Sequence, residues 1–173
     1  MSAPPAGHAA TAERAPRSAP TPSAAPELRL ARGPEELAAY FGIRRAVFVE
    51  EQGLFAGSDF DGHDHDALPI VALLEGRVVG VVRCYPAGGG IWYGGRLAVH
   101  PDHRTGQVGA LLVRKAVELM RSRGDVRRFL ATIQLQNVGF FRRLGWVRVG
   151  RVVRLHGKPH QVMERPLGSE GPR

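Results

Sequence analysis

The sequence predicts an α/β fold in which a central mixed β-sheet is flanked by helices. Short apolar runs typical of strands alternate with longer segments of helical periodicity. Tight turn signals join neighbouring strands in the middle of the chain. The resulting order of elements, β-α-β-β-β-α-β-α-β-β, indicates a single core, which suits a chain of 173 residues.

The two ends of the chain lack the composition of a folded segment. Residues 1–26 consist mainly of Ala, Pro, Ser, Thr and Gly, with almost no large apolar side chain. Such a segment buries too little apolar surface to offset the entropy lost on ordering, so we expect a disordered tail. Residues 168–173 are expected to be a flexible tail for the same reason. The predicted domain spans residues 27–167.

Each predicted element has a local cause. Pro34 favours a helix start, and Arg45 and Phe48 are expected on the inner face of that helix. Glu75-Gly76-Arg77 is a hairpin signal between two apolar runs. Gly124 ends the clearest amphipathic helix. The expected strands are 27–32, 70–74, 78–85, 91–99, 129–133, 146–155 and 161–164; the expected helices are 34–53, 108–123 and 137–144, with a loop at 57–67.

Charge and composition limit the classes of partner that the protein is expected to bind. The net charge of +8, carried almost entirely by Arg, favours an anionic partner such as nucleic acid, a membrane surface or a phosphorylated cofactor. The Arg residues are scattered, so a nucleotide-bearing cofactor fits at least as well as nucleic acid. No apolar run approaches the ~20 residues that span a bilayer, and the first residues do not resemble a secretory signal. The single cysteine, Cys84, agrees with a reducing compartment. We therefore expect a cytoplasmic protein with no nucleic-acid or membrane partner.

The segment before the second long helix is expected to bind an anion. The first N–H groups of a helix have no intrahelical partner, and the helix dipole adds positive charge there. Arg104 supplies a fixed charge, while Gly106 and Gly109 permit close backbone approach. A plain strand–helix turn with a solvent-facing Arg has the same local pattern, so this loop alone leaves both interpretations open.

The surroundings of the loop resemble the GNAT acetyltransferase superfamily. In that family a strand ending in Val is followed by Arg/Gln-x-x-Gly-x-Gly/Ala at the start of a long helix. The match runs ungapped from Leu97 to Gly124, with Arg104 and Gly109 at the first and last motif positions. Gln107 stands where the middle glycine is usual. The resemblance implies a GNAT-type fold with acetyl-CoA as co-substrate.

A second stretch, residues 134–146, resembles the family's later motif, Asn-x-x-Ala-x-x-Phe-Tyr-x-x-Leu-Gly-Phe. Gln134 takes the Asn position and Phe141 the Tyr position, while core packing is the alternative role for this stretch. The two motifs together imply the cofactor contacts. The resemblance places the pyrophosphate on the amides of Arg104, Thr105, Gly106, Gln107, Val108, Gly109 and Ala110, the pantetheine arm and thioester carbonyl against the backbone of Leu97, Ala98 and Val99, and further contacts at Gln134, Asn137 and Phe141.

A third stretch narrows the resemblance. Residues 44–53 resemble the Arg-x-x-Val-Phe-x-x-Glu-Gln signature of certain bacterial GNATs and, more distantly, of acyl-homoserine-lactone synthases. Together with residues 65–72 and 155–160, they are similar to a bacterial subgroup labelled nitrogen-starvation N-acetyltransferases. The resemblance implies transfer of an acetyl group to the amine of a small metabolite by direct attack in a ternary complex, and allows a homodimer.

Acetyl transfer requires that the amine lose a proton, that the carbonyl oxygen be stabilised and that the leaving thiolate be protonated. In some relatives an acid or His lies six residues before the Val of the motif strand, where this chain has Tyr93. Phe141 has no hydroxyl to protonate the thiolate. Tyr93 is a catalytic candidate, with a structural aromatic as the alternative. Glu51, at the acid position of the Glu-Gln signature, is a candidate base, with a solvated helix end as the alternative.

The predicted loop is rich in metal-ligand types. Zinc sites usually add a distant ligand pair at defined spacing, so we expect no metal and a polar loop beside the acceptor, whose carboxylates attract an amine. His156 and His160 lie on a predicted hairpin that, in the fold implied by the resemblance, often borders the acceptor pocket; we expect them to be solvent-exposed turn residues. The ligand-type residues of the loop are Asp59, Asp61, His63, Asp64, His65 and Asp66.

Two other functions stay open. An acyl-homoserine-type synthase shares the expected fold, but the chain is short and its phosphate loop is of ordinary acetyltransferase type. A CoA-binding regulatory module without turnover is suggested by Phe141 and by the missing acid at Tyr93.

Overall fold

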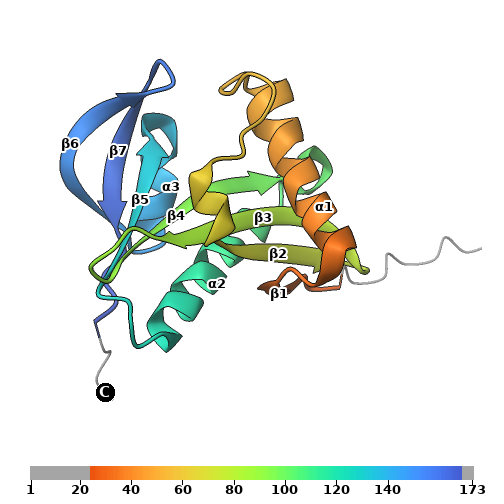
Figure 1. Ribbon diagram of the computed structural model, residues 1–173, viewed down its shortest axis with the longest axis horizontal. Helices are drawn as coiled ribbons and strands as arrows, with labels where there is room; N and C mark the ends of the chain where they lie inside the picture. The colour runs from red at the N-terminus through yellow and green to blue at the C-terminus, as the bar shows by residue number, and fades with distance from the viewer. Residues whose placement is uncertain (1–23, 169–173) are drawn as a thin grey trace, which may run out of the picture.

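A seven-stranded mixed sheet forms the frame of the domain (Figure 1). In the computed structural model, which describes residues 24–168, the strand order is β1-β2-β3-β4-β5-β7-β6. All neighbouring strands pair antiparallel except β4 and β5, which are parallel. Of the tails predicted at residues 1–26 and 168–173, residues 1–23 and 169–173 lie outside the described residues. The strands are β1 (Glu27–Leu30), β2 (Leu68–Leu74), β3 (Arg77–Pro86), β4 (Ile91–Val99), β5 (Arg128–Gln134), β6 (Val147–Leu155) and β7 (Lys158–Glu164).

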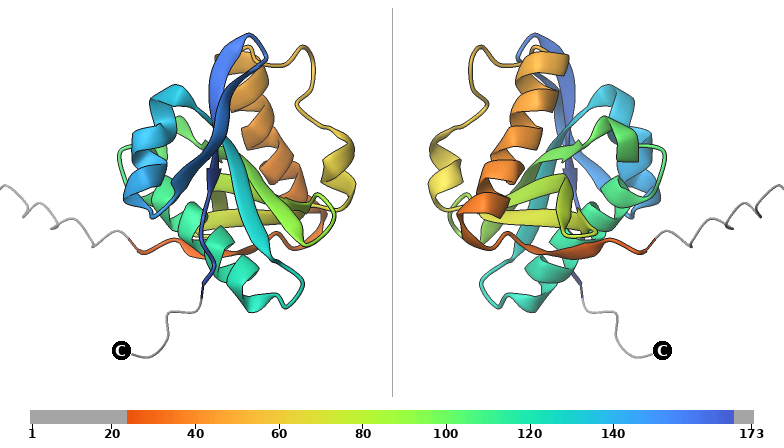
Figure 2. Two further views of the ribbon diagram at one scale, coloured as in Figure 1. Left: turned by 90° about the vertical axis from the view of Figure 1, so that its left-hand side faces the viewer. Right: turned by 90° about the vertical axis from the view of Figure 1, so that its right-hand side faces the viewer.

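Helices cover both faces of this sheet (Figure 2). Helix α1 and its continuation η1 lie on one face, and α2 and α3 lie on the other. The predicted mixed sheet flanked by helices and the predicted order of elements are confirmed. The helices are α1 (Gly33–Arg44), η1 (Arg45–Glu51), η2 (Gly62–His65), η3 (Pro101–His103), α2 (Val108–Ser122), η4 (Leu135–Asn137) and α3 (Val138–Arg143).

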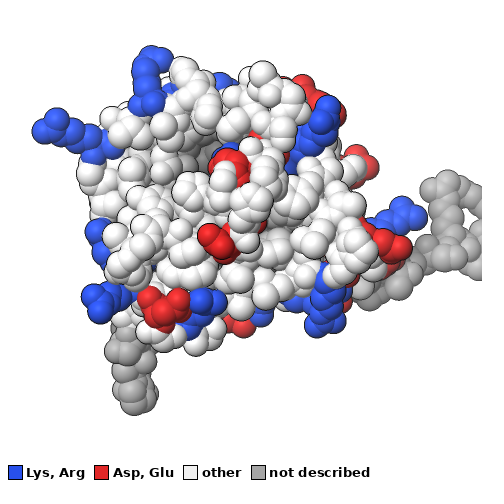
Figure 3. Space-filling view, viewed as in Figure 1, with Lys and Arg blue, Asp and Glu red and all other residues white. Residues whose placement is uncertain are grey.

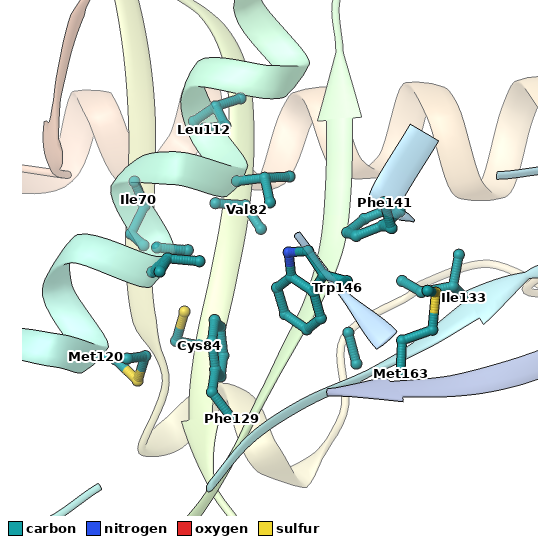
Figure 4. Packing of buried hydrophobic residues seen from close by; sticks show 14 of the residues in the cluster. Ile70, Val82, Cys84, Leu112, Met120, Phe129, Ile133, Phe141, Trp146 and Met163 are labelled. Atoms are coloured by element: carbon teal, nitrogen blue, oxygen red, sulfur yellow. The ribbon is translucent and has the colours of Figure 1, made fainter. Parts of the chain in front are cut away.

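Each face of the sheet has its own hydrophobic core. The larger core lies under α2 and α3, where Leu112 of α2 belongs to one cluster with Phe129 of β5 and Trp146 (Figure 4). The smaller core lies under α1 and η1. Because successive strand residues point to opposite faces, β3 sends Val82 to the larger core and Val81 to the smaller one.

The helix predicted for residues 34–53 changes character halfway. It is α-helical only as far as Arg44 and continues as a π-helix, where the N–H of Gln52 donates to the Val47 carbonyl at 2.9 Å. The prediction that Arg45 faces inward is wrong: Arg44 is fully buried, whereas the Arg45 side chain is 61% exposed. Arg44 is held inside by carboxylates of the loop that follows. Single π-turns of this kind are frequent near functional sites.

Two smaller differences between the predicted and the observed elements concern the loop at residues 57–67 and the last hairpin. The predicted loop 57–67 contains the short helix η2, whose start is capped reciprocally by Asp61 and Asp64. The last strand begins at Lys158 rather than at residue 161, because Lys158 already pairs with Leu155 of β6. Among the described residues, no helix is long and apolar enough to cross a bilayer.

Candidate active site

The parallel strands β4 and β5 separate halfway along their length. They pair only over Ile91–Gly94 and Arg128–Ala131. Beyond this point β4 stays paired with β3 through a bulge, in which Arg96 and Leu97 lie opposite a single β3 residue. Arg96 has a φ of 53°, a left-handed conformation that is rare for a residue with a side chain. The bulge bends β4, and a wedge-shaped opening remains between β4 and β5.

One edge of β4 faces this opening with free backbone groups. The His100 N–H donates to the Val79 carbonyl at 2.8 Å, and Ala98 pairs with Val81. Hydrogen-bond direction alternates along an antiparallel strand, so Leu97 and Val99 turn their N–H and C=O groups toward β5. The backbone of Ala98 is instead used by β3, and its side chain lies in the smaller core. The structure thus brings Leu97 and Val99, but not Ala98, to the opening.

The first turn of α2 lies at the wide end of the opening. The N–H groups of Val108, Gly109 and Ala110 have no hydrogen-bond partner within residues 24–168. Gly109 packs against the end of β4: a Cβ placed on it would lie 3.8 Å from the Val99 side chain. Gln107, which replaces the usual middle glycine, has a φ of −97°, which any residue adopts without strain. The helix start therefore offers the predicted set of backbone donors despite this replacement.

Arg104 and Glu51, two predicted site residues, form one ion pair. Arg104 Nη1 and Nη2 donate to Glu51 Oε1 and Oε2 at 2.7 and 2.6 Å, and Arg104 Nε donates to the Val99 carbonyl at 2.9 Å. The hydrogen bonds from Arg104 hold the pKa of Glu51 below its ordinary value. The carboxylate that was considered as a base is therefore stabilised in its charged form, which weakens it as a proton acceptor.

A cavity of about 480 Å³ passes through the opening from one face of the sheet to the other. On the α2 side its walls include Val113 and Phe141, and on the α1 side they include Phe48 and Tyr93. Figure 3 shows the α1 side, where the surface is hollowed beside the β6–β7 hairpin and charged side chains lie mainly at the edge of the view. Of the predicted site residues, Tyr93, Leu97, Gln134, Asn137 and Phe141 line this cavity, whereas Glu51 lies outside it.

The acidic loop is neutralised by three arginines. Arg44 donates to Asp59 at 2.7 Å and also to Asp64, while Arg83 pairs with Asp64 at 3.0 Å. Burial alone raises the pKa of Asp64, but hydrogen bonds from Arg44, the Asp61 backbone and Arg83 hold it far below its ordinary value. Three further ion pairs close the network: Arg83 pairs with Asp61 at 2.7 Å, and Arg96 pairs with Asp59 and Asp61 at 3.0 and 3.3 Å.

This network corrects one expectation about the loop. Its three central carboxylates are already occupied by guanidinium groups, so they are not free to attract an amine. Their function is to tie the loop to α1, β3 and the bulge of β4. Within residues 24–168, no cluster of His, Cys, Asp and Glu side chains has the arrangement of a metal site.

Comparison with known families assigns this architecture. The model of the Acetyltransferase (GNAT) family matches residues 35–146, which include the π-helix, the bulge, the helix start and the later motif. The chain belongs to the GNAT family. The predicted superfamily membership and the predicted enzyme class, an N-acetyltransferase, are thereby confirmed.

Individual GNAT relatives agree with this assignment. The chain is 30% identical over 119 residues to the uncharacterised N-acetyltransferase YjcF of Bacillus subtilis (strain 168), covering 68% of this chain and 82% of YjcF. The crystal structure of Escherichia coli ElaA superposes with a TM-score of 0.73 at 26% identity, over 82% of this chain and 99% of ElaA. The acyl-homoserine lactone synthase BjaI, solved with SAM and isopentyl-CoA, has the same fold at 20% identity, with a TM-score of 0.66 and coverage of 82% and 83%.

GNAT acetyltransferases use acetyl-CoA or another acyl-CoA as co-substrate. The residues present fit such a molecule. The unpaired amides at the start of α2 suit a diphosphate, and the edge groups of Leu97 together with the Val99 N–H suit the amides of a pantetheine arm, while the Val99 carbonyl is occupied by Arg104 Nε. The cavity then continues through the sheet, so the arm has room to reach the opening.

The prediction that His160 is an exposed turn residue is wrong. It lies in β7, is only 7% exposed and lines the cavity. Its Nδ1 lies 2.9 Å from the Lys158 carbonyl oxygen. Because a carbonyl only accepts, Nδ1 carries the hydrogen, and Nε2 of the neutral ring keeps a lone pair. The ring is therefore held in the tautomer that a general base requires.

Sequence reasoning missed two polar residues at the site, Arg83 and Arg96, and it preferred an exposed turn for His160 over a position beside the acceptor pocket. Arg83 had a detectable signal, because it is a lone charge inside the apolar run Val81–Cys84 and a buried charge needs a partner. Arg96 follows two glycines, which indicates an irregular strand but not a bulge at this position. The resemblance offered a place beside the acceptor for His160, but its burial could not be predicted because it depends on β7 lying beside β5.

Proposed function

We propose that this GNAT protein transfers an acyl group from acyl-CoA to the amine of a small metabolite by direct attack in a ternary complex. The observation that carries the proposal is the cavity that crosses the sheet through the β4–β5 opening. Because the cavity has walls on both faces, donor and acceptor can approach the opening from opposite sides at the same time. Direct transfer needs no covalent enzyme intermediate in this geometry.

The backbone around the opening binds and orients the donor in this proposal. Acyl-CoA supplies an activated acyl group in the form of a thioester. The unpaired amides of Val108, Gly109 and Ala110 hold the diphosphate, whereas the predicted Arg104 amide is already bonded to the Pro101 carbonyl; the Leu97 N–H, the first free donor after the bulge, stabilises negative charge on the acyl oxygen. The bulge at Arg96 positions this donor, and the arginine network holds the bulge.

The acceptor side of the cavity offers an aromatic wall. The His63 and Tyr85 rings stack at 4.2 Å, and Tyr85 stacks on Tyr93 at 5.8 Å between ring centroids. Burial raises the pKa of Tyr85, so its phenol stays protonated at neutral pH. This wall suits the apolar or planar part of a small amine. In the same proposal the Tyr93 phenol protonates the leaving thiolate, because Phe141 lacks a hydroxyl.

His160 is the base in this proposal. Its side chain shares a face of the sheet with that of Gln134, its register partner on β5, and lines the acceptor half of the cavity. Nε2 takes a proton from the amine, and the Lys158 carbonyl stabilises the positive ring that results. Glu51 fits this role less well, because it lies outside the cavity and is paired with Arg104.

The experiment that tests the function is a thiol-release screen of purified protein with acetyl-CoA and a panel of small amines, including amino acids. We expect CoA release that depends on one class of amine. Binding of CoA by calorimetry without amine-dependent thiol release from any acyl-CoA would replace the enzyme with a CoA-binding module. Release that requires SAM as acceptor would instead favour a signal synthase of the kind represented by BjaI.

A further inference from the structure

We infer that the acceptor of this enzyme is a free amino acid whose carboxylate binds Arg96. This inference deepens the proposed function and rests on it. Arg96 lies in the bulge of β4, immediately before Leu97, and lines the cavity. Its guanidinium lies on the α1 side of the sheet, 4.4 Å from the centre of the Phe55 ring and 5.9 Å from that of Phe48, which belongs to the smaller core. Arg96 therefore lies in the half of the cavity that the proposed function assigns to the amine.

One guanidinium nitrogen of Arg96 is left for a ligand. Nε donates to Asp59 Oδ2 and Nη2 to the Asp59 carbonyl, each at 3.0 Å, and Nη2 also donates to Asp61 at 3.3 Å. Nη1 has no hydrogen-bond partner within residues 24–168. It is not sealed in the interior, because the Arg96 side chain is 17% exposed and the buried side-chain nitrogens without a partner in this part of the chain are Arg83 Nε and Trp146 Nε1. Nη1 can therefore donate to a molecule in the cavity.

The arginine network presents positive charge to the cavity. The network as a whole holds as many arginines as aspartates. Of its members, however, the two cations Arg83 and Arg96 line the cavity with one carboxylate, that of Asp61. Both Asp61 oxygens already accept hydrogen bonds from Arg83 at 2.7 Å. A ligand on this side thus meets an unmatched positive charge, which favours a carboxylate over a neutral group.

The pKa values of the network agree with this arrangement. Burial and the nearby charge of Arg83 lower the pKa of Arg96. Burial also acts against Arg83, but hydrogen bonds to Asp61 and Asp64 raise its pKa overall. Arg96 is therefore the less neutralised of these two cations, and the carboxylate of a ligand would offset its desolvation.

An amino acid meets the other demands of the site. A carboxylate on Arg96 keeps the amine in the same half of the cavity as His160, and the stacked rings of Tyr85 and Tyr93 suit an apolar side chain. The cavity of about 480 Å³ also holds the acyl end of the donor, so the acceptor must be small. In the reaction the neutral amine nitrogen forms a bond to the acyl carbon while the carbon–sulfur bond breaks. One proton passes from the amine to His160 and one from Tyr93 to the thiolate, which gives an N-acyl amino acid and free CoA; exchange with water restores both side chains.

Substrates that differ at the carboxylate test the inference on the full chain. Thiol release with acetyl-CoA is compared for L-phenylalanine, L-phenylalaninamide and 2-phenylethylamine, and for the matching series of any further amino acid that the panel identifies. We expect kcat/KM to be about 10- to 100-fold higher for an amino acid than for the amide or the amine of its series, as for a hydrogen bond between charged groups. Equal or higher values for the amides and amines would overturn the inference and leave the proposed function intact. No release of CoA with any amine would refute the proposed function itself.

The Arg96→Gln variant assigns the preference to this side chain. The ratio of kcat/KM for the amino acid to that for its amide is expected to lose its preference for the acid. A general loss of activity through the bulge affects both substrates equally and leaves this ratio unchanged. Arg45→Gln, on an exposed arginine of η1 that does not line the cavity, is the matched control and should keep the wild-type ratio.

A binding measurement on the wild type covers the case in which Arg96→Gln does not fold. Calorimetry in the presence of CoA compares N-acetyl-L-phenylalanine with its amide, and the acid is expected to bind more tightly by a similar factor. A wild-type ratio in a folded Arg96→Gln variant, or equal binding of the acid and its amide, would contradict the assignment of Arg96.

Discussion

The Arg104 side chain at the mouth of the site has two possible partners, the Glu51 carboxylate and a diphosphate. Arg104 is bound by the Glu51 carboxylate in this structure, whereas the proposed function requires it beside a diphosphate. Both side chains are substantially exposed, at 38% and 44%, so the ion pair is weak enough to be exchanged. The ion pair links π-helix η1 to the loop before α2, and in the proposed function Glu51 would compete with the donor for Arg104.

The competition predicts that Glu51→Gln strengthens the binding of acetyl-CoA. Removing one exposed charge partner is expected to raise the affinity about two- to fivefold, because such pairs contribute about 0.2–1 kcal/mol. Calorimetry at low and high salt measures the effect, and Glu50→Gln on the same helix is the control. Weaker binding by Glu51→Gln would show that this carboxylate supports the donor instead of displacing it.

The second prediction at this scale concerns His160. The His160→Asn variant retains an N–H that can reach the Lys158 carbonyl but has no Nε2. We expect kcat to fall by about 10²-fold or more, with the KM for acyl-CoA nearly unchanged. His156→Asn, at the exposed turn, should behave like the wild type. Steady-state thiol release with the amine found in the panel measures both variants, and a loss confined to KM would assign His160 to acceptor binding.

At the scale of elements, the contact between α2 and β3 sets the position of the donor site. A Cβ on Gly80 would lie 2.9 Å from both Leu112 Cδ1 and Val108 Cγ1. Val108 is the first residue of α2, so any shift that relieves this contact moves the amides that face the opening. Gly80 thus fixes the helix start by allowing it to approach the sheet.

Gly80→Ala is accordingly expected to lower the free energy of unfolding by about 1–3 kcal/mol through overpacking. Acetyl-CoA affinity should fall as well, because the first turn of α2 is displaced. Urea denaturation and calorimetry measure the two effects. Gly42→Ala, whose Cβ meets nothing within 4 Å in α1, should be neutral or stabilising. A stable Gly80→Ala variant with unchanged affinity would contradict the assigned packing.

The arginine network also acts between elements, because it joins α1, the acidic loop, β3 and β4. Arg44→Ala would leave Asp59 and Asp64 without their shared cation and is expected to lower the free energy of unfolding by about 3–5 kcal/mol at pH 7. Arg77→Ala, at the exposed start of β3, is the control.

The pH dependence of that loss follows from the depressed pKa values of Asp61 and Asp64. A carboxylate whose folded pKa is lowered stabilises the fold above its unfolded pKa of 3.8, and this contribution disappears as the pH falls further. The wild type should therefore lose stability below about pH 4, where the unfolded chain binds more protons. The gap between wild type and Arg44→Ala should narrow over the same range, and a constant gap would argue against these carboxylates.

For the molecule as a whole, the exposed edge strand β6 is a candidate surface for association between copies. Strand β6 is the outer strand beside β7, and Val147 and Val152 on it are 48% and 52% exposed, interspersed with Arg148, Arg151 and Arg154. Exposed apolar side chains on an unpaired edge strand offer a template for pairing with another chain. We propose that two copies associate through β6. Light scattering should give twice the mass of one chain; Val152→Lys should give a monomer and Leu37→Lys on α1 should not. A monomeric wild type would rule out this association.

Much of the architecture was predictable because it depends on local periodicity. The apolar runs around Gly76 and the stripe of α2 determine which segments are strands or helices, and the anion loop lies between two of them. The remainder depends on contacts between distant segments. Arg96 meets Asp59 across 37 residues, and the burial of His160 requires β7 to lie beside β5. No window of sequence contains both partners of either contact.

Because the cavity crosses the sheet, strand β5 contributes side chains to it from both of its faces. Along β5, the side chains of Phe129 and Ile133 belong to the core on the α2 side, while those of Thr132 and Gln134 lie on the opposite face, and all four line the cavity. In the proposed function the two faces receive different substrates, so a substitution at one of these positions is expected to alter one preference and leave the other unchanged. Donor and acceptor selectivity could then be altered separately, one substitution at a time, on the same frame.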